Sequence, residues 1–478
     1  MGANDSSGTS IRSSAKLLSE DLASGKISSF ELICHYMRQI AADDKQGKHI
    51  NAVLEINPDA LFIAEALDAE RKAKGVRGPM HGMPVLLKDN IDTGDAMHTS
   101  AGSLALKDNY ANADAFLVAK LRAAGAIVLG KANLTEWANF MAEDMPNGYS
   151  SRGGQVLNPY GPGLFDVGGS SSGSAAGVAA GFAPMAVGTE TSGSILSPAS
   201  ANHLVGIKPT VGLISRSGII PISHSQDTAG PIANTVWDAA LLLGIMAGPD
   251  LQDSATLHSM GHGQLDYTKY LTRRDLKGFR FGVPGGAYLD GVRPEKLAVF
   301  QQALNLLRSL GAEVVEDVAL YVFEDTEMTV LKHEFKSGLN AYLHRHQSTD
   351  QVKNLSDVIA YNKKYADVAL TFGQSVLIES DETDGTLTSP QYIQARLMDL
   401  QRSRVEGIDK VMEQHELNAL LFIGAAGSEI AAKAGYPSVA VPAGFTLSGE
   451  PVGLTFTGRA FSEPQLLTFA FAWEQAQI

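Results

Sequence analysis

The chain alternates between two hydrophobic patterns, one typical of amphipathic helices and one typical of short buried strands. Apolar residues recur at helical spacing in segments that predict helices over 14–42, 58–74, 113–124 and 133–140. Short apolar runs bounded by turn residues predict strands over 85–88, 126–130, 184–188, 438–441 and 453–456. Segment 174–181 contains almost only Ala, Gly and Val, which favours a closely packed helix. This alternation of elements predicts an α/β fold.

Length and local composition define the predicted organisation of the chain. With 478 residues and 44% hydrophobic composition, the chain can bury a large core, and no Pro/Gly/Ser-rich linker divides it. Segment 251–420 carries more charge and fewer glycines than its flanks, so we predict peripheral helices and loops there. We expect a single domain over 1–478, with N-terminal helices at 10–75, a core at 76–250 and C-terminal core strands at 421–478.

Charge and motif content exclude several classes of function. The formal net charge of −14 predicts an acidic surface that repels phosphate backbones, so we expect no nucleic-acid partner. No apolar run reaches the roughly 18 residues of a membrane-spanning helix, and residues 1–14 lack the apolar segment of a signal peptide. Cys34 is the single cysteine, and no His-Glu-x-x-His or Cys-x-x-Cys motif occurs. We therefore expect a cytoplasmic protein without a metal or cofactor, with export of a processed form left open.

Lys88 ends a predicted apolar strand and is followed by Asp89. Burial at such a position disfavours the ammonium form and lowers the pKa of the lysine, so that the side chain can act as a base. The alternative is a lysine whose ammonium group reaches solvent from the strand end or pairs with Asp89. Position alone favours this second interpretation.

Segment 168–174, Gly-Gly-Ser-Ser-Ser-Gly-Ser, can expose hydroxyl and backbone N–H groups together just before a predicted helix. Three interpretations are open. A phosphate-binding loop lacks the expected Gly-Lys-Ser/Thr ending. A nucleophile elbow of the Gly-x-Ser-x-Gly type would make Ser171 the nucleophile and His203 or His224 its base, but the expected preceding strand is missing from the pattern. The third interpretation is a flexible loop.

A second turn rich in Gly and Ser spans 188–199, with the sequence Gly-Thr-Glu-Thr-Ser-Gly-Ser-Ile-Leu-Ser-Pro-Ala. A predicted strand leads into this turn. Successive backbone N–H groups in such a turn can converge on one point, which is what stabilisation of an oxyanion requires. Ser194, at the end of the turn, would then be placed to attack a carbonyl carbon bound there.

In their order and spacing, the lysine and the two serine-rich segments resemble the amidase signature family. The resemblance covers most of the core and is carried by segments 82–90, 168–181, 188–199, 205–211, 225–231 and 434–463. It implies an α/β amidase signature fold, with a large mixed central β-sheet that helices cover on both faces. It also implies hydrolysis of carboxamide C–N bonds through an acyl-enzyme intermediate.

The resemblance assigns the family's catalytic residues to Lys88, Ser170 and Ser194. Ser194 corresponds to the nucleophile, and Ser170 to a serine preceded by a cis peptide bond. It implies that Ser170 passes the proton of Ser194 to a neutral lysine. The expected oxyanion hole consists of the backbone N–H groups of Thr191, Ser192, Gly193 and Ser194. The expected supporting residues are Ser171 and Asp227, with a loop-capping role as the alternative for the aspartate.

Three positions depart from the usual family pattern. Ser172 and Ser192 stand where glycine is frequent, and Leu196 stands where many members have arginine. Ser172 is expected to tighten its loop, and Ser192 adds a hydroxyl beside the expected oxyanion hole. Leu196 weakens the case for recognition of a charged substrate through that position.

The subgroup that this sequence resembles is that of the peptide amidases. The similar segments are 189–191, 208–216, 218–223, 334–336 and 339–343. This likeness implies a small-molecule or peptide amide substrate, either a C-terminal peptide amide or a small aryl or acyl amide, with esters and carbamates also open. We expect a monomer or homodimer. The substrate pocket is expected to be walled by parts of 141–165, 320–345 and 422–446.

Two alternatives use the same scaffold. The glutaminase-type subunit of a tRNA-dependent amidotransferase shares the signature but would require partner subunits and tRNA. The acidity of the chain, Leu196 and the peptide-amidase-like middle segment argue against it. An inactive binding protein would have no need for Lys88, Ser170 and Ser194 together, yet all three are present.

Overall fold

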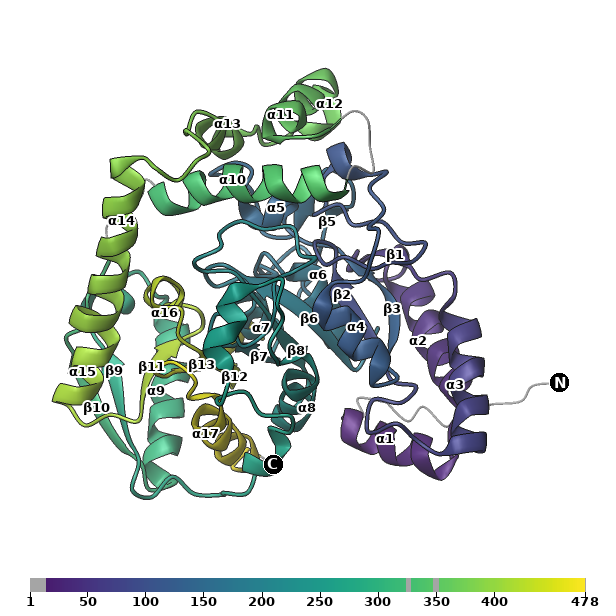
Figure 1. Ribbon diagram of the computed structural model, residues 1–478. Helices are drawn as coiled ribbons and strands as arrows, with labels where there is room; N and C mark the ends of the chain where they lie inside the picture. The colour runs from purple at the N-terminus through teal and green to yellow at the C-terminus, as the bar shows by residue number, and fades with distance from the viewer. Residues whose placement is uncertain (1–13, 324–327, 347–351, 478) are drawn as a thin grey trace.

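The computed structural model describes residues 14–323, 328–346 and 352–477, so residues 10–13 of the predicted N-terminal helical segment lie outside it. Within this part of the chain, one mixed β-sheet of eleven strands forms the centre of the molecule, and helices cover both of its faces (Figure 1). The spatial order of the strands is β1, β3, β2, β6, β8, β7, β12, β13, β11, β9 and β10. This architecture confirms the predicted α/β fold.

The strands that carry the site lie in the first half of the sheet. These are β2 (Pro84–Lys88), β3 (Ile127–Ala132), β6 (Met185–Glu190), β7 (Val205–Lys208) and β8 (Thr228–Ala233). The other members are β1 (Val53–Ile56), β9 (Arg280–Pro284), β10 (Glu313–Val318), β11 (Ala419–Ile423), β12 (Ser438–Phe445) and β13 (Pro451–Thr457). A separate antiparallel pair consists of β4 (Tyr149–Ser150) and β5 (Gly154–Gln155). Because β2 pairs in parallel with β6, both strands end at the same edge of the sheet.

Two groups of helices pack directly against the strands of the first half. One group consists of α6 (Ser172–Ala179) and α7 (Leu196–Ala201), which contact each other. The second group consists of α4 (Phe116–Ala123) and α8 (Val236–Met246), and α17 (Glu463–Gln475) packs on α8 and on the next strands, β12 and β13. In α6, small residues permit a very close approach: a Cβ added to Gly173 would lie 2.3 Å from the carbonyl oxygen of Asn133. The predicted close packing of this helix is thus confirmed.

The remaining helices complete the cover of the sheet, and one of them, α9 (Pro294–Ser309), packs against β10, β12 and β13. The N-terminal ones are α1 (Ala15–Ser24), α2 (Ser29–Asp43) and α3 (Ala60–Lys74). The second half of the chain adds α9 (Pro294–Ser309), α10 (Thr329–His346), α11 (Leu355–Lys364), α12 (Ala366–Ala369), α13 (Ser375–Asp381), α14 (Pro390–Leu400), α15 (Asp409–Gln414) and α16 (Ser428–Ala434). Helix α2 begins with a capping box, in which Ser28 and Glu31 each accept a backbone hydrogen bond from the other.

Two sequence-based expectations for the fold are wrong. Segment 251–420 is not only peripheral, because β9 and β10 extend the central sheet beyond β11. Segment 133–140 does not form a helix: only a short turn, α5 (Glu136–Asn139), is present, and Trp137 and Ala138 adopt left-handed backbone angles with φ of 52° and 54°. Tertiary hydrogen bonds fix this turn, since the N–H of Trp137 donates to the Ala101 carbonyl at 2.9 Å.

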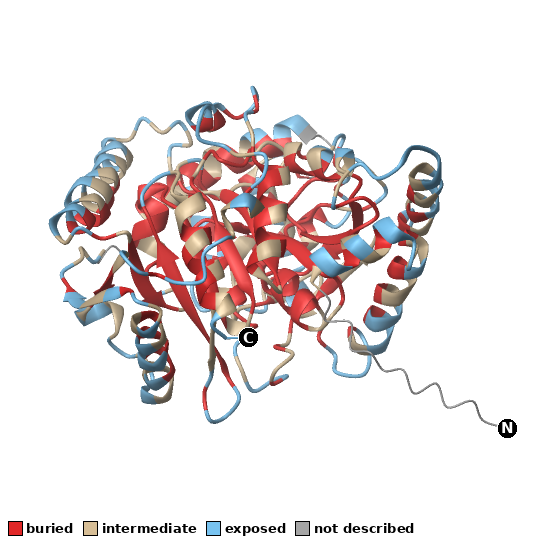
Figure 2. Ribbon diagram, turned by 90° about the horizontal axis from the view of Figure 1, so that it is seen from below, coloured by how far each residue is buried: buried red, intermediate tan, exposed pale blue. Residues whose placement is uncertain are grey.

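The core lies between the sheet and its two layers of helices. Figure 2 shows the strands buried in the middle of the molecule, with exposed residues mainly on the surrounding helices and loops. A second apolar cluster joins α10 to the turn after β3, where the ring of Phe335 lies 5.0 Å from that of Phe140. This cluster holds α10 above the edge at which β2 and β6 end (Figure 1). None of the helices in the described ranges has both the length and the apolar character needed to cross a bilayer.

Candidate active site

Lys88 ends β2 with its ammonium group inside the protein, and the residue is fully buried. Its Nζ donates a hydrogen bond to Ser170 Oγ at 2.8 Å and another to the Thr189 carbonyl oxygen at 3.2 Å. Burial lowers the pKa of Lys88 to about 7, although the negative charges of Glu190 and Asp227 partly oppose this effect. The lysine is therefore poised to exchange a proton with the Ser170 hydroxyl near neutral pH.

The alternative roles of Lys88 disagree with the structure. The side chain does not reach solvent, and the Asp89 carboxylate is engaged elsewhere. Asp89 accepts hydrogen bonds from the N–H groups of Ser100 and Gly102, each at 3.2 Å, and pairs with Arg152 at 3.5 Å. The interpretation that Lys88 is a solvent-reaching lysine or the partner of Asp89 is therefore wrong.

The first serine-rich segment forms a tight loop that leads from the region of β4 and β5 into α6. The peptide bond between Gly169 and Ser170 is cis, as the sequence resemblance predicts. The Ser170 carbonyl accepts a hydrogen bond from the Thr135 N–H at 3.1 Å, which ties the loop to the end of β3. The Ser172 hydroxyl donates to the Gly168 carbonyl at 2.6 Å and so tightens the loop as expected. The flexible-loop interpretation is wrong, because the loop is both buried and hydrogen-bonded.

Ser171 connects the two serine-rich segments. Its N–H donates to the Ser194 carbonyl at 3.1 Å. Its hydroxyl donates to the Thr189 carbonyl at 3.0 Å and accepts from the Thr189 N–H at 3.2 Å. The nucleophile-elbow alternative is therefore wrong, since the backbone of β6 engages the Ser171 hydroxyl, while the His203 ring stacks on Phe445. Ser171 instead holds the Ser170 loop against the strand that leads to Ser194.

The second turn presents Ser194 between the end of β6 and the start of α7. Gly193 adopts φ of +82°, a left-handed conformation that favours glycine. A Cβ added to this glycine would also lie only 3.1 Å from the hydroxyl oxygen of Ser428. Ser194 itself is 7% exposed, whereas Ser192 is exposed at the surface of the turn. The nucleophile candidate is thus nearly enclosed.

Glu190 fixes the backbone that follows Ser194, a role that the sequence analysis did not identify. Its carboxylate accepts hydrogen bonds from the N–H groups of Ile195 at 2.7 Å and Leu196 at 3.0 Å. Burial raises the pKa of Glu190, and the charge of Lys208 opposes this shift together with the backbone N–H groups of Leu196, Ile195 and Gly193. One signal in the sequence could have identified this residue, because Glu190 is the single carboxylate of the turn 188–199 and stands between two threonines.

The four expected oxyanion donors lie in the turn after β6. Among the described residues, the N–H groups of Thr191, Ser192 and Ser194 donate to no other protein group. The N–H of Gly193 is one of the backbone groups that lower the pKa of Glu190. The oxyanion hole formed by Thr191, Ser192, Gly193 and Ser194 stays a prediction.

Asp227 joins the turn to a neighbouring loop. One carboxylate oxygen accepts a hydrogen bond from the Thr191 hydroxyl at 2.6 Å, and the other accepts from the N–H groups of Ile222 and Ser223, each at 2.8 Å. Burial raises the pKa of Asp227, and the hydrogen bond from Thr191 partly offsets this effect. Asp227 therefore caps the loop at Ile222 and Ser223 and also contacts the turn before Ser194, while its support of the site stays a prediction.

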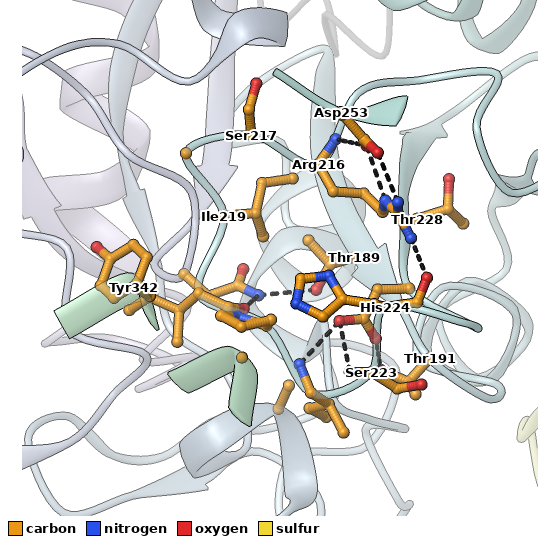
Figure 3. A pocket seen from close by; sticks show the side chains of 18 of the residues that line it. Thr189, Thr191, Arg216, Ser217, Ile219, Ser223, His224, Thr228, Asp253 and Tyr342 are labelled. Atoms are coloured by element: carbon orange, nitrogen blue, oxygen red, sulfur yellow. Dashed lines mark hydrogen bonds and ion pairs between the residues drawn. The ribbon is translucent and has the colours of Figure 1, made fainter. Parts of the chain in front are cut away.

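A cavity of about 170 Å³ adjoins the turn (Figure 3). Thr189 and Thr191, from the end of β6 and the turn that leads to Ser194, line part of its wall. The opposite walls come from α10 and from the loop 216–224. Part of the predicted wall segment 320–345 thus lines this cavity, whereas 141–165 and 422–446 do not. The contribution of 216–224 escaped the sequence analysis, because only the fold brings it beside β6.

Within the described ranges, no group of three or more His, Cys, Asp or Glu side chains is arranged to hold a metal ion. The chemistry that this site can perform with its own residues is transfer of a proton from a serine hydroxyl to a neutral lysine. Backbone N–H groups beside Ser194 can bind a developing negative charge. This combination suits nucleophilic attack on a carbonyl group.

The chain is similar to known proteins over nearly its whole length. The sequence profile of a family described as Amidase matches residues 31–423. A probable amidase of Arabidopsis thaliana is 40% identical over 465 residues, covering 95% of this chain and 88% of the relative. The X-ray structure of native peptide amidase from Stenotrophomonas maltophilia matches with a TM-score of 0.91 and 45% identity, covering 97% of this chain and 96% of that one. A glutamyl-tRNA(Gln) amidotransferase subunit of Methylobacillus flagellatus is 39% identical over 307 residues, covering 64% of this chain and 60% of the relative.

Proposed function

The chain belongs to the amidase signature family, whose members are hydrolases that act on amide bonds, and from this premise we propose that Ser194 is its nucleophile and that Ser170 and Lys88 form its proton relay. The observation that carries this proposal is the 2.8 Å hydrogen bond between Lys88 Nζ and Ser170 Oγ. A pKa lowered to about 7 leaves a substantial fraction of Lys88 neutral at physiological pH.

Catalysis proceeds in two acyl-transfer steps. In the first, Lys88 takes the proton of Ser170 while Ser170 takes that of Ser194, and Ser194 Oγ forms a bond to the carbonyl carbon. The tetrahedral intermediate then breaks its C–N bond as the proton returns through Ser170 to the leaving nitrogen. In the second step, water attacks the acyl-enzyme and the same relay removes its proton. The C–O bond to Ser194 then breaks as Lys88 returns the proton through Ser170 to Ser194 Oγ, which releases the carboxylic acid and regenerates the free enzyme.

The oxyanion that forms in each step binds to the turn after β6. We assign its donors as the backbone N–H groups of Thr191, Ser192, Gly193 and Ser194. Gly193 also contributes a left-handed bend to the turn, with φ of +82°. Asp227 acts as a positioning residue, since its hydrogen bond to the Thr191 hydroxyl restrains the first donor of the set. A fixed set of donors stabilises the transition state without reorganisation during the reaction.

The substrate class that we propose is C-terminal peptide amides or small aryl and acyl amides, with ester or carbamate cleavage as a further capability of the same acyl-enzyme chemistry. Support comes from the extent of the similarities. Likeness to the peptide amidase covers 97% of the chain, whereas likeness to the amidotransferase subunit covers 64% of it. The alternative, a glutaminase-type subunit, would need partner subunits and tRNA for its transfer reaction.

The test is to locate the acyl group. Wild-type protein is mixed with N-acetyl-phenylalaninamide, quenched in acid and digested, and mass spectrometry is used to identify the acylated peptide. We expect an adduct on Ser194 and release of ammonia by the isolated chain. Ser194→Ala should lower kcat by about 10⁴-fold or more, because the nucleophile is absent. Ser197→Ala, on the same segment, is the matched control and should retain activity.

Two outcomes would contradict the proposal. An adduct on Ser171, or substantial turnover by Ser194→Ala at an unchanged melting temperature, would exclude Ser194 as the nucleophile. Ammonia release that occurs only after addition of partner subunits and tRNA would favour the glutaminase-type alternative.

A further inference from the structure

We propose that Glu334, on α10, is a positioning residue for the reaction, because it holds the loop 221–227 in the conformation from which Asp227 restrains Thr191. This inference rests on the proposed function, since it assumes that an oxyanion binds to the turn before Ser194. It goes further by giving a part in catalysis to a residue of α10, a helix that supplies none of the proposed catalytic residues.

Glu334 is a buried carboxylate, 2% exposed, whose two oxygens have different partners. Its Oε2 accepts hydrogen bonds from the N–H and the hydroxyl of Ser225, each at 3.0 Å, and from the hydroxyl of Ser223. Its Oε1 accepts from the Tyr392 hydroxyl at 2.8 Å. Tyr392 belongs to α14, which meets α10 at one end (Figure 1). One side chain therefore joins the loop to both helices.

The segment of the loop that Glu334 holds also carries the contacts of Asp227. The Ser223 hydroxyl donates to Glu334, while the Ser223 N–H donates to one Asp227 oxygen at 2.8 Å. The Asp227 N–H donates back to the Ser223 carbonyl at 2.9 Å. The other Asp227 oxygen accepts from the Thr191 hydroxyl at 2.6 Å, and Ser223 and Thr191 lie on the same side of the cavity (Figure 3). A shift of Ser223 would therefore move Asp227 and, through it, Thr191.

Close packing fixes the distance between α10 and this loop. Gly338 stands four residues after Glu334, so the two positions share one face of the helix. A Cβ added to Gly338 would lie 3.1 Å from the Pro221 side chain and 3.2 Å from the His224 ring. The helix thus approaches the loop closely, and Glu334 reaches Ser223 and Ser225 from a defined position.

A carboxylate suits this position, because every one of its described partners is a donor. Hydrogen bonds to an ionised acceptor are stronger than those between neutral groups. A buried donor that loses its acceptor is costly, so the loop should rearrange when the acceptor is removed. The expected consequence is a displaced Thr191 and not a general loss of the fold, because Glu334 lies outside the central sheet.

The test is hydrolysis of N-acetyl-phenylalaninamide by variants whose melting temperature is measured alongside. Glu334→Ala should lower kcat by about 10-fold with little change in KM, because a misplaced oxyanion donor weakens binding of the transition state. Glu334→Gln should recover most of kcat, since its amide oxygen can accept from the loop while its NH₂ group donates to the Tyr392 hydroxyl.

The matched control is Lys336→Ala, on the same helix. It removes a side chain whose Nζ donates to the Thr383 carbonyl at 2.8 Å, away from the loop. This variant should leave both kcat and KM unchanged. A loss of kcat in Lys336→Ala equal to that in Glu334→Ala would show a general effect of disturbing α10 and would overturn the assignment.

A double-mutant cycle with Thr191→Val tests the route of the effect. If Glu334 acts through Asp227 and the Thr191 hydroxyl, the double variant should have the kcat of Thr191→Val alone, about 10-fold below wild type. Independent effects would multiply to about 100-fold. Ser223→Ala deletes one donor to Glu334 but keeps the backbone contact with Asp227, so it gives the same cycle with a smaller perturbation if Glu334→Ala folds poorly.

The outcomes separate this inference from the proposed function. If the wild type hydrolyses the amide and Ser194→Ala does not, the mechanism stands. An unchanged kcat in Glu334→Ala, an effect on KM alone, or multiplicative losses in the cycle would then overturn the positioning role of Glu334. If the wild type releases no ammonia, the proposed function fails and this inference fails with it.

Discussion

The pH dependence of amide hydrolysis should follow the titration of Lys88. The relay requires the neutral amine, and burial lowers the pKa of this lysine from its ordinary 10.5 to about 7. The folded protein therefore loses this proton at lower pH than an exposed lysine would. Activity should rise as pH increases through about 7 and reach a plateau above about 8, because Lys88 is then almost entirely neutral.

The magnitude follows from the shift. With a pKa of about 7, roughly half of Lys88 is neutral at pH 7, about a tenth at pH 6 and about a hundredth at pH 5. We therefore expect kcat/KM to fall about 10-fold for each pH unit below 6. A lysine with the ordinary value of 10.5 would instead give a rate that keeps rising to about pH 10.

The assay is ammonia release from a substrate that does not ionise, such as N-acetyl-leucinamide, measured between pH 5 and 10. Asp92 and Glu136 also have a pKa raised by burial to about 7, so the midpoint must be assigned to an amine. An ammonium group has a much larger heat of ionisation than a carboxyl group. Warming should therefore move the midpoint to lower pH. A flat profile down to pH 5, a rise that continues through pH 9, or a midpoint insensitive to temperature would refute the role of Lys88 as the base.

Three further predictions concern Glu190 and Asp227 at the site and Asp238 on α8. Glu190→Gln removes the larger of the two negative charges that hold the proton on Lys88, so the acid limb of the kcat/KM profile should move to lower pH; an unmoved limb would show that the charges are uncoupled. Thr191→Val removes the hydroxyl that donates to Asp227 and should lower kcat by about 10-fold with little change in KM, and an effect on KM alone would contradict a positioning role. Burial raises the pKa of Asp238 to about 6, so the folded state holds this proton more tightly and stability falls as pH rises from about 4 to 6. Asp238→Asn should therefore raise the free energy of unfolding by about 1–3 kcal/mol at pH 8 and by little at pH 4, as measured by urea denaturation, and equal effects at both would exclude linkage to this group.

The elements that were predicted correctly are those whose local pattern agrees with their tertiary environment. The strand that ends at Lys88 and the helix of small residues after Ser171 are buried on all sides, so their composition is distinctive. The same holds for the strand that leads to Glu190. In each case a short apolar or small-residue run is bounded by glycine or serine, and the packing requires those residue types.

The errors arose where tertiary contacts override local pattern. Strand β10 lies at the edge of the sheet and has charged, exposed positions, which are typical of edge strands but give a weak strand signal. The turn at Glu136–Asn139 has apolar residues at helical spacing, yet hydrogen bonds from distant segments hold it in a left-handed conformation. Neither outcome is encoded within a window of ten residues, because both depend on neighbours far away in the chain.

The candidate site shows the same limit at the level of chemistry. Each candidate residue also had an interpretation without a catalytic role. For Lys88 the sequence pattern favoured a lysine that reaches solvent or pairs with Asp89, whereas the residue is fully buried. The proposed role of Lys88 depends on its contact with Ser170, which lies 82 positions away in the chain. The parallel pairing of β2 with β6 is part of what brings the two residues together. That pairing places the end of β2 beside the turn after β6, and the Ser171 hydroxyl then fastens the Ser170 loop to the same strand. The resemblance supplied the names of the three residues, but the lowered pKa on which the proposed base role of Lys88 depends follows from burial, which is a property of the assembled sheet.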